Sequence, residues 1–216
     1  MWKSRMTQQR NKQLPLIVGH PALVMIDFQR DMYLPADVGG IPRMAGAEQR
    51  VPRARALVDA ARRHGVPVIF IQEVHRPDLI DFGRELDGQE GVHCIEGQRL
   101  TEIAAEDVDY RPGDYFVPKR RYSAFFGTDL EILLKGLKAQ TLILTGGLTD
   151  VCVHYTFVDA HQHDYHCRVV EDCVGGSGQE AHEASLRAME YLQTGARCSS
   201  VAVLEAFAAL KPARVA

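Results

Sequence analysis

Three reactive side chains follow apolar runs of the kind that form buried strands. Asp27 closes the run ALVMID, Lys119 closes YFVPK, and Cys152 comes shortly after TLILTG, behind the turn GGLTD. Ligands of open parallel sheets bind at the carboxyl ends of the strands, so these three positions are expected to share one edge. A thiol, a carboxylate and an ammonium group that meet there would form a nucleophile, acid/base and cation set suited to acyl transfer.

Cys152 stands near the start of a segment with helical spacing, from Thr149 to His163. The two glycines before it allow a sharp bend, and Thr149 or Asp150 is expected to cap the helix. A thiol in the first helical turn faces unpaired N–H groups and the positive end of the helix dipole, which are expected to lower its pKa. The alternative is a small buried apolar residue, which is the role of most cysteines.

Asp27 and Lys119 also admit structural interpretations. A carboxylate at a strand end commonly accepts backbone hydrogen bonds, and a lysine is commonly a surface cation. As catalytic groups, Asp27 would accept the thiol proton and return it to a leaving group. Lys119 would stabilise both anions electrostatically. The residue types alone leave both interpretations open.

The elements around these residues indicate an α/β protein. Strands alternate with helices along the chain, which predicts a mostly parallel sheet covered on both faces, a three-layer α-β-α sandwich. Further strands are expected at 67–72, 167–172 and 200–204, and helices at 48–64, 129–136, 179–193 and after 204. Residues 73–97 form a long polar loop, and loops of that length in a compact domain are usually functional or mobile.

Length and composition restrict the class of protein further. The chain has 216 residues, which suits an N-terminal arm at 1–20 and a single domain at 21–216. The net charge of −3 lacks the basic footprint of a nucleic-acid partner. No secretory signal and no apolar run long enough to span a membrane is present, so a cytoplasmic location is expected. Five cysteines at irregular spacing argue against a disulfide framework.

Cofactor and metal motifs are missing from the sequence. No GxGxxG follows the first strand and there is no Walker motif, so a nucleotide cofactor is not expected. His161, His163 and His166 resemble a metal tract, but they fall at a helix C-terminus, where solvated histidines are favoured. His75 and His93 flank the long loop without an HExxH or DxH pattern. The sequence therefore predicts neither a metal site nor a cofactor.

Three separated motifs resemble the isochorismatase-like cysteine hydrolases. They are VMIDFQRDM (24–32), VPKRRYSAFFGTDLE (117–131) and LTGGLTDVCVHYTFVDA (144–160), in the order the family has them. The resemblance covers nearly the whole chain after the arm. It implies the isochorismatase-like, Rossmann-like fold and a homo-oligomer, either a dimer or a tetramer.

The resemblance also implies the roles of particular residues. The family's Asp–Lys–Cys triad maps to Asp27, Lys119 and Cys152. A non-proline cis peptide maps to Gly147–Leu148, and the N–H groups of Leu148 and Cys152 would then form an oxyanion hole.

The cysteine favours cleavage of a C–N bond, because family members that cleave a vinyl ether lack it and amide hydrolases need it. The stretch EVHRPDLIDFG (73–83) is similar to a loop of hydrolases acting on biuret and ureidoacrylate. The expected substrate is a small linear amide, carbamoyl or ureido compound, hydrolysed through a thioester. Two alternatives remain: an ester or enol-ether hydrolase on the same scaffold, and a non-catalytic binding protein.

Seven further side chains are expected to contribute to the pocket. They are Phe28, Gln29, Tyr33, Arg76, Arg121, Tyr122 and Tyr155. The aromatic residues would form its rim, although each could equally belong to the core. The two arginines would bind a substrate carboxylate or carbonyl, against the alternative of exposed surface residues. Gln29 would orient the Asp27 carboxylate.

Overall fold

The fold is built on a six-stranded parallel sheet with the strand order β3-β2-β1-β4-β5-β6. The computed structural model describes residues 14–35 and 38–210. The strands are β1 (His20–Ile26), β2 (Val68–Glu73), β3 (Tyr115–Lys119), β4 (Ala139–Gly147), β5 (His166–Gly175) and β6 (Arg197–Cys198). The predicted α/β class with a parallel sheet is confirmed. Most of the predicted N-terminal arm, residues 1–13, lies outside the described residues.

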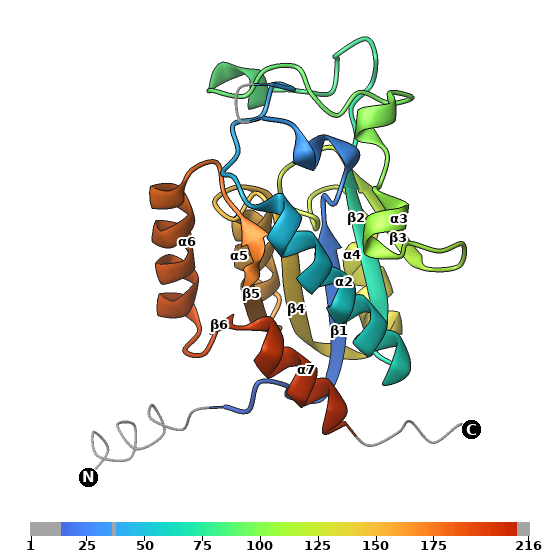
Figure 1. The fold of residues 1–216 in the computed structure, drawn as a ribbon, viewed down its shortest axis with the longest axis vertical. Coiled ribbons are helices and arrows are strands. Elements are labelled where there is room, and N and C mark those ends of the chain that lie inside the picture. The colour runs from blue at the N-terminus through green and yellow to red at the C-terminus, as the bar shows by residue number, and fades with distance from the viewer. Residues whose placement is uncertain (1–13, 36–37, 211–216) are drawn as a thin grey trace.

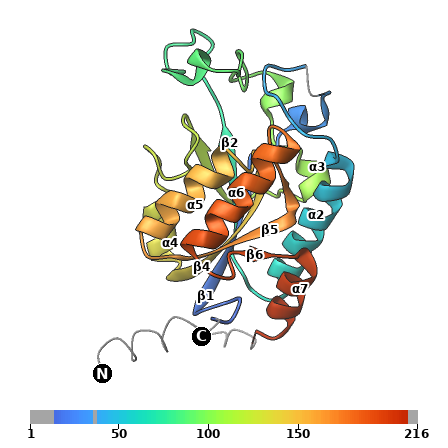
Figure 2. The same ribbon diagram turned by 90° about the vertical axis from the view of Figure 1, so that its left-hand side faces the viewer.

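Helices cover both faces of the sheet, which makes the three layers visible in Figures 1 and 2. One face carries α2 (Ala47–Arg63), α3 (Ala105–Val108) and α7 (Ser200–Ala208); the other carries α4 (Leu130–Gly136), α5 (Cys152–Gln162) and α6 (Gln179–Leu192). Side chains of β1 alternate between the two cores. Val24 and Ile26 pack with α4, α5 and α6, whereas Leu23 and Met25 pack with α2 and α7. Successive strand residues point to opposite faces, so the central strand supports both layers.

Helix α2 forms because its apolar residues recur at helical spacing. Val51, Ala54, Leu57 and Val58 are all buried against the sheet. Complete burial of a side chain such as Leu57 contributes about 1.5–3 kcal/mol. The predicted helix at 48–64 is confirmed to within one residue at each end. The anchored first turn of α2 matters for function, because it lies beside the cavity described below.

The strand predicted at 200–204 is wrong, because these residues belong to helix α7. Ser199 caps that helix by accepting a hydrogen bond from the N–H of Ala202 at 3.2 Å. Val203 and Phe207, four residues apart, are both fully buried on one side of it. A five-residue apolar run fits a strand or a helix equally well, and the cap with the continued spacing selects the helix.

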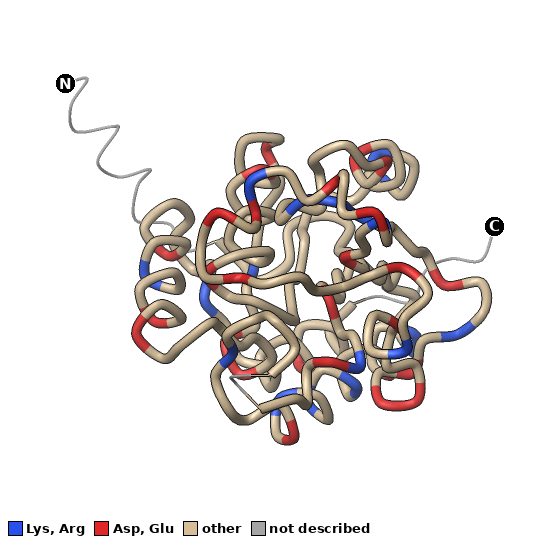
Figure 3. Tube along the Cα trace, turned by 90° about the horizontal axis from the view of Figure 1, so that it is seen from above, with Lys and Arg blue, Asp and Glu red and all other residues tan. Residues whose placement is uncertain are grey.

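Two long segments cover the carboxyl ends of the strands, at the top of Figure 1. A short bridge between Gln29 and Ile103 joins the segment after β1 to the segment between β2 and β3, and a second bridge, His75 with Ile95, lies within the latter segment. Seen from above in Figure 3, acidic and basic residues are interspersed in this region. None of the described helices is long and apolar enough to cross a membrane. The segment after β1 and the segment between β2 and β3 together enclose the candidate site.

Candidate active site

The structure brings Asp27, Lys119 and Cys152 together at the carboxyl edge of the sheet. The Lys119 Nζ atom lies 3.0 Å from Asp27 Oδ2 and 3.3 Å from Cys152 Sγ. Lys119 is fully buried, and Cys152 is 6% exposed. The ammonium group therefore stands between the carboxylate and the sulfur, at hydrogen-bond distance from both.

Strand order explains why residues so distant in sequence meet. β1 lies between β2 and β4, and β3 lies beyond β2, so Asp27, Lys119 and Cys152 follow or end strands within a group of four consecutive strands, and Lys119 reaches across β2 to the other two. Asp27 adopts a left-handed backbone conformation with φ of 53°, which turns the chain immediately after β1. Its Oδ1 accepts a hydrogen bond from the N–H of Glu73 at 2.9 Å, which fixes the carboxylate against β2.

Close packing at the end of β4 also depends on a glycine. Gly146 has φ of 109°, and a Cβ at this position would stand 1.8 Å from the carbonyl oxygen of Ile26. Any other residue would push β4 away from β1. Gly146 therefore allows the segments that carry Asp27 and Cys152 to lie close together.

A second carboxylate, Glu73, belongs to the same cluster and was missed by the sequence analysis. It ends β2 and is the register partner of Lys119, whose Nζ contacts Glu73 Oε2. The same oxygen lies 3.2 Å from Cys152 Sγ. The signal was present, since Glu73 ends an apolar strand as Lys119 does, but the strand was predicted to stop at residue 72 and Glu73 was placed in the loop.

The pKa values of the two carboxyl groups are shifted in opposite directions. Burial raises the pKa of Asp27 to about 6, and Lys119 only partly opposes that shift. Burial alone would also raise the pKa of Glu73, but Lys119 and hydrogen bonds from His75 and His93 hold it well below its usual range. Glu73 thus stays ionised near neutral pH, whereas Asp27 can both accept and release a proton.

The thiol is protonated in the resting site. Burial raises the pKa of Cys152 well above its usual range, Lys119 opposes the shift, and the carboxylates of Glu73 and Asp27 add to it. The sequence analysis expected a lowered pKa from the helix N-terminus, and the structure corrects this. Cys152 is indeed the first residue of α5, but burial beside two carboxylates outweighs the helix dipole.

Lys119 remains charged despite its burial. Desolvation alone would lower its pKa, but Asp27, Cys152 and Glu73 together raise it well above the usual value. A fixed positive charge beside the sulfur favours the thiolate at the moment it forms.

Two backbone N–H groups beside Cys152 are available for a ligand. The peptide bond between Gly147 and Leu148 is cis. Within residues 14–35 and 38–210, the N–H groups of Leu148 and Cys152 have no hydrogen-bond acceptor, whereas the N–H groups of Val151 and Val153 donate to the Leu148 carbonyl. The expected oxyanion-hole donors are therefore unsatisfied.

The expected side-chain cap of α5 is absent. The residue before the helix is Val151, and no side chain caps it. Thr149 instead makes a 2.9 Å hydrogen bond with His182, and Asp150 accepts one from the N–H of Ser177 at 2.8 Å. Thr149 ties the turn to α6 and Asp150 ties it to the segment before α6, so both side chains position Cys152 from outside its own helix.

A cavity opens beside Cys152 beneath the covering segments. Its lining includes parts of the segment after β1, the first turn of α2, the loop after β2 and the glycine turn before α5. Phe28, Gln29 and Tyr122 of the predicted pocket residues line it. Tyr155 lines a neighbouring depression, where its ring stacks on Tyr122 with centroids 5.8 Å apart.

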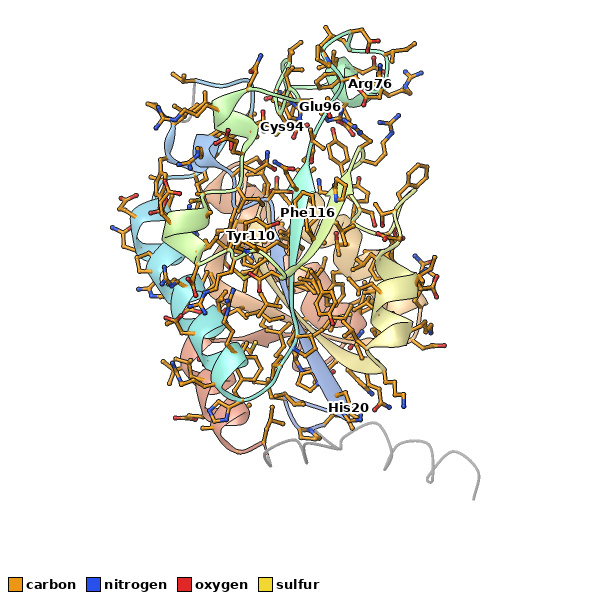
Figure 4. All side chains as sticks on the ribbon, turned by 90° about the vertical axis from the view of Figure 1, so that its right-hand side faces the viewer. His20, Arg76, Cys94, Glu96, Tyr110 and Phe116 are labelled. Atoms are coloured by element: carbon orange, nitrogen blue, oxygen red, sulfur yellow. The ribbon has the colours of Figure 1, made fainter. Side chains whose placement is uncertain are left out.

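The remaining predicted pocket residues are not among those lining the cavity. Tyr33 is 47% exposed. Arg76 pairs with Asp78 at 3.4 Å and lies among the loops above the strands, as Figure 4 shows. Arg121 donates to the carbonyl of Asp81 and holds the loop between β2 and β3.

Gln29 acts on the backbone beside the triad. Its Nε2 donates to the carbonyls of Glu73 and Thr101 at 3.0 and 2.9 Å, and its Oε1 accepts the Glu73 N–H at 3.0 Å. The same N–H also serves Asp27. Gln29 thus positions Glu73 and reaches Asp27 only through this shared donor.

Four buried side chains next to the triad are of metal-binding type. Glu73, His75, Glu85 and His93 each offer a ligand atom, and these atoms lie within 4.8 Å of one another. A divalent ion held by them would supply Lewis acidity beside the cavity. The negative charges of this cluster can also be balanced without a metal ion, by a protonated histidine. Burial alone would lower the pKa of His75, but hydrogen bonds to Glu73 and Glu85 raise it to about 9. The absence of a metal site therefore stays a prediction.

The site and the fold together define a hydrolase scaffold, and the comparisons with known proteins identify its family. The model of the Isochorismatase domain matches residues 21–203, and the chain belongs to this isochorismatase family of hydrolases. Its three-layer fold is the isochorismatase-like fold expected from the motifs.

Relatives of known activity are distant. The chain is 33% identical over 169 residues to a maleamate amidohydrolase from Pseudomonas putida, covering 77% of each chain. It is 29% identical over 206 residues to the ureidoacrylate amidohydrolase RutB from Pseudomonas savastanoi pv. phaseolicola, covering 85% of this chain and 82% of the relative. The solved structure of an N-carbamoylsarcosine amidase from Thermoplasma acidophilum superposes with a TM-score of 0.69 at 28% identity, covering 84% and 97% of the two chains.

Proposed function

We propose that the protein is a cysteine-dependent amidohydrolase that cleaves a C–N bond in a small linear amide, carbamoyl or ureido compound. The observation that carries this proposal is the position of Cys152 Sγ, 3.3 Å from the Lys119 ammonium group in a site that also holds a titratable carboxylate. The amidohydrolase activities of the distant relatives support the same reaction class.

The first half of the reaction makes a thioester. Asp27 accepts the thiol proton as the Cys152 sulfur attacks the substrate carbonyl carbon. The N–H groups of Leu148 and Cys152 stabilise the oxyanion of the tetrahedral intermediate. The C–N bond then breaks, and Asp27 delivers its proton to the departing nitrogen, which leaves as ammonia or an amine.

The second half returns the enzyme to its starting state. Asp27 accepts a proton from water, whose oxygen attacks the thioester carbonyl carbon. The C–S bond breaks, the carboxylic or carbamic acid is released, and the proton on Asp27 returns to the Cys152 sulfur. Lys119 and Glu73 remain an ion pair throughout, so that the charge of the site changes only at Asp27, the sulfur and the substrate.

Two other functions use the same scaffold. An ester or enol-ether hydrolase would release an alcohol or an enol product in place of ammonia. A binding protein would retain the cluster and bind small amides without turnover.

An ammonia-release screen tests the proposal. The panel comprises biuret, ureidoacrylate, N-carbamoyl amino acids, maleamate and nicotinamide, each with wild-type protein and the Cys152→Ala variant. Ammonia release by the wild type alone is the expected result. Absence of ammonia across the panel, or equal release by the variant, contradicts the proposal.

A further inference from the structure

Two arginines line the cavity, and only one of them has a carboxylate partner. Arg43 pairs with Asp31, Nη2 to Oδ2, at 3.2 Å, and the two side chains are 9% and 14% exposed. Arg50 makes no ion pair with any carboxylate in the described part of the chain; the nearest acidic influence is Glu48, beyond contact distance. A half-buried guanidinium without an acid partner has charge left to offer a ligand.

Backbone atoms hold the Arg50 guanidinium in place. Nη1 donates to the carbonyl of Ala45 at 2.7 Å, and Nη2 donates to the carbonyl of Met44 at 3.2 Å. These two bonds use two of the five N–H donors of the group, so three donors remain. The guanidinium is therefore oriented before a ligand arrives, which reduces the entropy lost on binding.

The position of the guanidinium places it near the reacting atoms. It lies against Gly175, where a Cβ would stand 2.7 Å from Nε, Cζ and Nη2. Gly175 is the register partner of Gly147, one strand away at a spacing of about 4.8 Å. Gly147 precedes the Leu148 N–H that faces the substrate in the proposed reaction. Only a glycine at position 175 leaves room for Arg50 beside this turn.

The first turn of α2 adds to the positive potential at this side of the cavity. Ala47, Arg50 and Val51 of this turn all line it. The 17-residue helix begins after Gly46 without a side-chain cap, so no side chain of the described residues occupies its first N–H groups; the one acidic residue of this turn, Glu48, is exposed and does not cap them. A helix N-terminus and a fixed guanidinium both favour an anion.

The acidic residues of the lining are already engaged elsewhere. Asp31 pairs with Arg43, while Asp27 and Glu73 pair with Lys119. Glu90 accepts a hydrogen bond from the Tyr122 hydroxyl at 2.9 Å, and burial raises its pKa. Among the described lining residues, Arg50 is left as the cation whose charge nothing compensates.

We infer that Arg50 binds a carboxylate of the substrate, so that the substrate is a short amide or ureido acid with its scissile carbonyl at Cys152. This inference rests on the proposed function and narrows its substrate class from neutral and anionic amides to carboxylate-bearing ones. A planar guanidinium suits the task because it binds a carboxylate through two parallel hydrogen bonds. The role expected from the sequence for Arg76 or Arg121 falls to an arginine of α2.

A matched substrate pair tests the inference. Maleamate and maleamide differ only in a carboxylate replaced by a neutral amide. Arg50→Gln is expected to lower kcat/KM for maleamate about tenfold or more, mainly through a higher KM. For maleamide, the same substitution should change kcat/KM less than about threefold. Arg50→Lys should recover part of the maleamate activity, because it restores the positive charge but not the two parallel hydrogen bonds of a guanidinium group.

The control variant is Arg63→Gln, which removes the same charge from the exposed end of α2. It lies thirteen residues further along the helix, about 20 Å away, and should leave both substrates unaffected. Equal losses for maleamate and maleamide in Arg50→Gln would show that Arg50 only anchors the loop at Met44 and Ala45, and would overturn the inference. So would unchanged kinetics for both.

A binding measurement keeps the test independent of turnover. Maleate is expected to slow alkylation of Cys152 by the neutral reagent iodoacetamide, and Arg50→Gln should require at least about tenfold more maleate for the same protection. Failure of maleate to protect the wild type, or equal protection of Arg50→Gln, would overturn the inference. If maleate protects through Arg50 but no amide in the panel releases ammonia, the proposed function fails and the carboxylate site stands.

Discussion

The two ends of the sheet each bury a basic side chain, and they satisfy its charge differently. At the carboxyl end, Lys119 is surrounded by Asp27, Glu73 and the Cys152 sulfur. At the amino end, Arg168 is 2% exposed, and among the described residues it donates only to the backbone carbonyls of Pro15, Leu16 and Cys167.

The difference distinguishes a buried charge that only stabilises the fold from one that can take part in proton transfer. The partners of Arg168 are neutral groups that cannot change protonation state, so the contact can only hold the segment before β1 onto β5. The partners of Lys119 include a carboxylate with a pKa of about 6 and a thiol, and both can gain or lose a proton. Burial of a charge is common to both ends, whereas titratable partners beside a cavity occur at the carboxyl end.

The largest expected effect separates the cysteine beside Lys119 from a cysteine away from the cavity. Cys152→Ala should lower kcat by about 10⁴-fold or more while the protein stays folded, because the nucleophile is lost. Cys198→Ala, in β6 away from the cavity, is the matched control and should retain turnover. Ammonia release and circular dichroism measure the two properties. Substantial activity in Cys152→Ala would remove the sulfur from the mechanism.

Removing the buried cations is the next test. Lys119→Met leaves Asp27 without its cation and Glu73 with only His75 and His93 as partners, so it should lower the free energy of unfolding by about 3–5 kcal/mol and also abolish most turnover. Arg168→Met leaves carbonyl groups unsatisfied and should cost roughly 1–3 kcal/mol with normal kcat per folded molecule. Urea unfolding and kcat distinguish them. A loss of kcat in folded Arg168→Met would contradict the division between the two ends.

A smaller effect concerns the pH dependence. Asp27 must be ionised to accept the thiol proton, so kcat/KM should be retained above pH 6 and fall about tenfold per unit below it. Glu73 is one of the groups that raise the Asp27 pKa. Glu73→Gln should therefore move the acid limb to lower pH. Glu96→Gln, at an exposed position in the loop after β2, should leave the limb in place. An acid limb that Glu73→Gln does not move would contradict the coupling.

The smallest expected effect is at the outer loop. Arg76→Ala should change kcat/KM by less than about threefold, because Arg76 is exposed, pairs with Asp78 and is absent from the lining of the cavity. A loss of tenfold or more would show that the loop closes over the substrate and would restore the role expected from the sequence.

The sequence contained enough information to predict the sheet and the triad, because each depends on a local pattern. Apolar runs predict the strands, and a reactive residue at the end of a run falls at the carboxyl edge of any parallel sheet. Glu73 was missed only because the end of β2 was placed one residue early. The first half of α7 was predicted as a strand, because the five residues 200–204 carry no distinct period; the helix expected after residue 204 is its second half.

The cavity lining could not be predicted in the same way. Arg43 and Arg50 reach it because the segment after β1 crosses the carboxyl ends before α2 begins, and that path has no local signal in the residues themselves. The raised pKa of Cys152 likewise depends on Glu73 and Asp27 arriving from two other strands. Properties that arise from several segments at once required the structure.

The separation of β1 from β4 along the chain has a consequence for biosynthesis. Asp27 emerges from the ribosome early, but its partner sulfur, at the start of the helix after β4, is made 125 residues later. Until β4 inserts beside β1, a nascent chain holds a base without a nucleophile. If the proposed reaction holds, turnover reports that β4 has inserted beside β1, and a truncated product that ends before α5 is inactive because it lacks the sulfur.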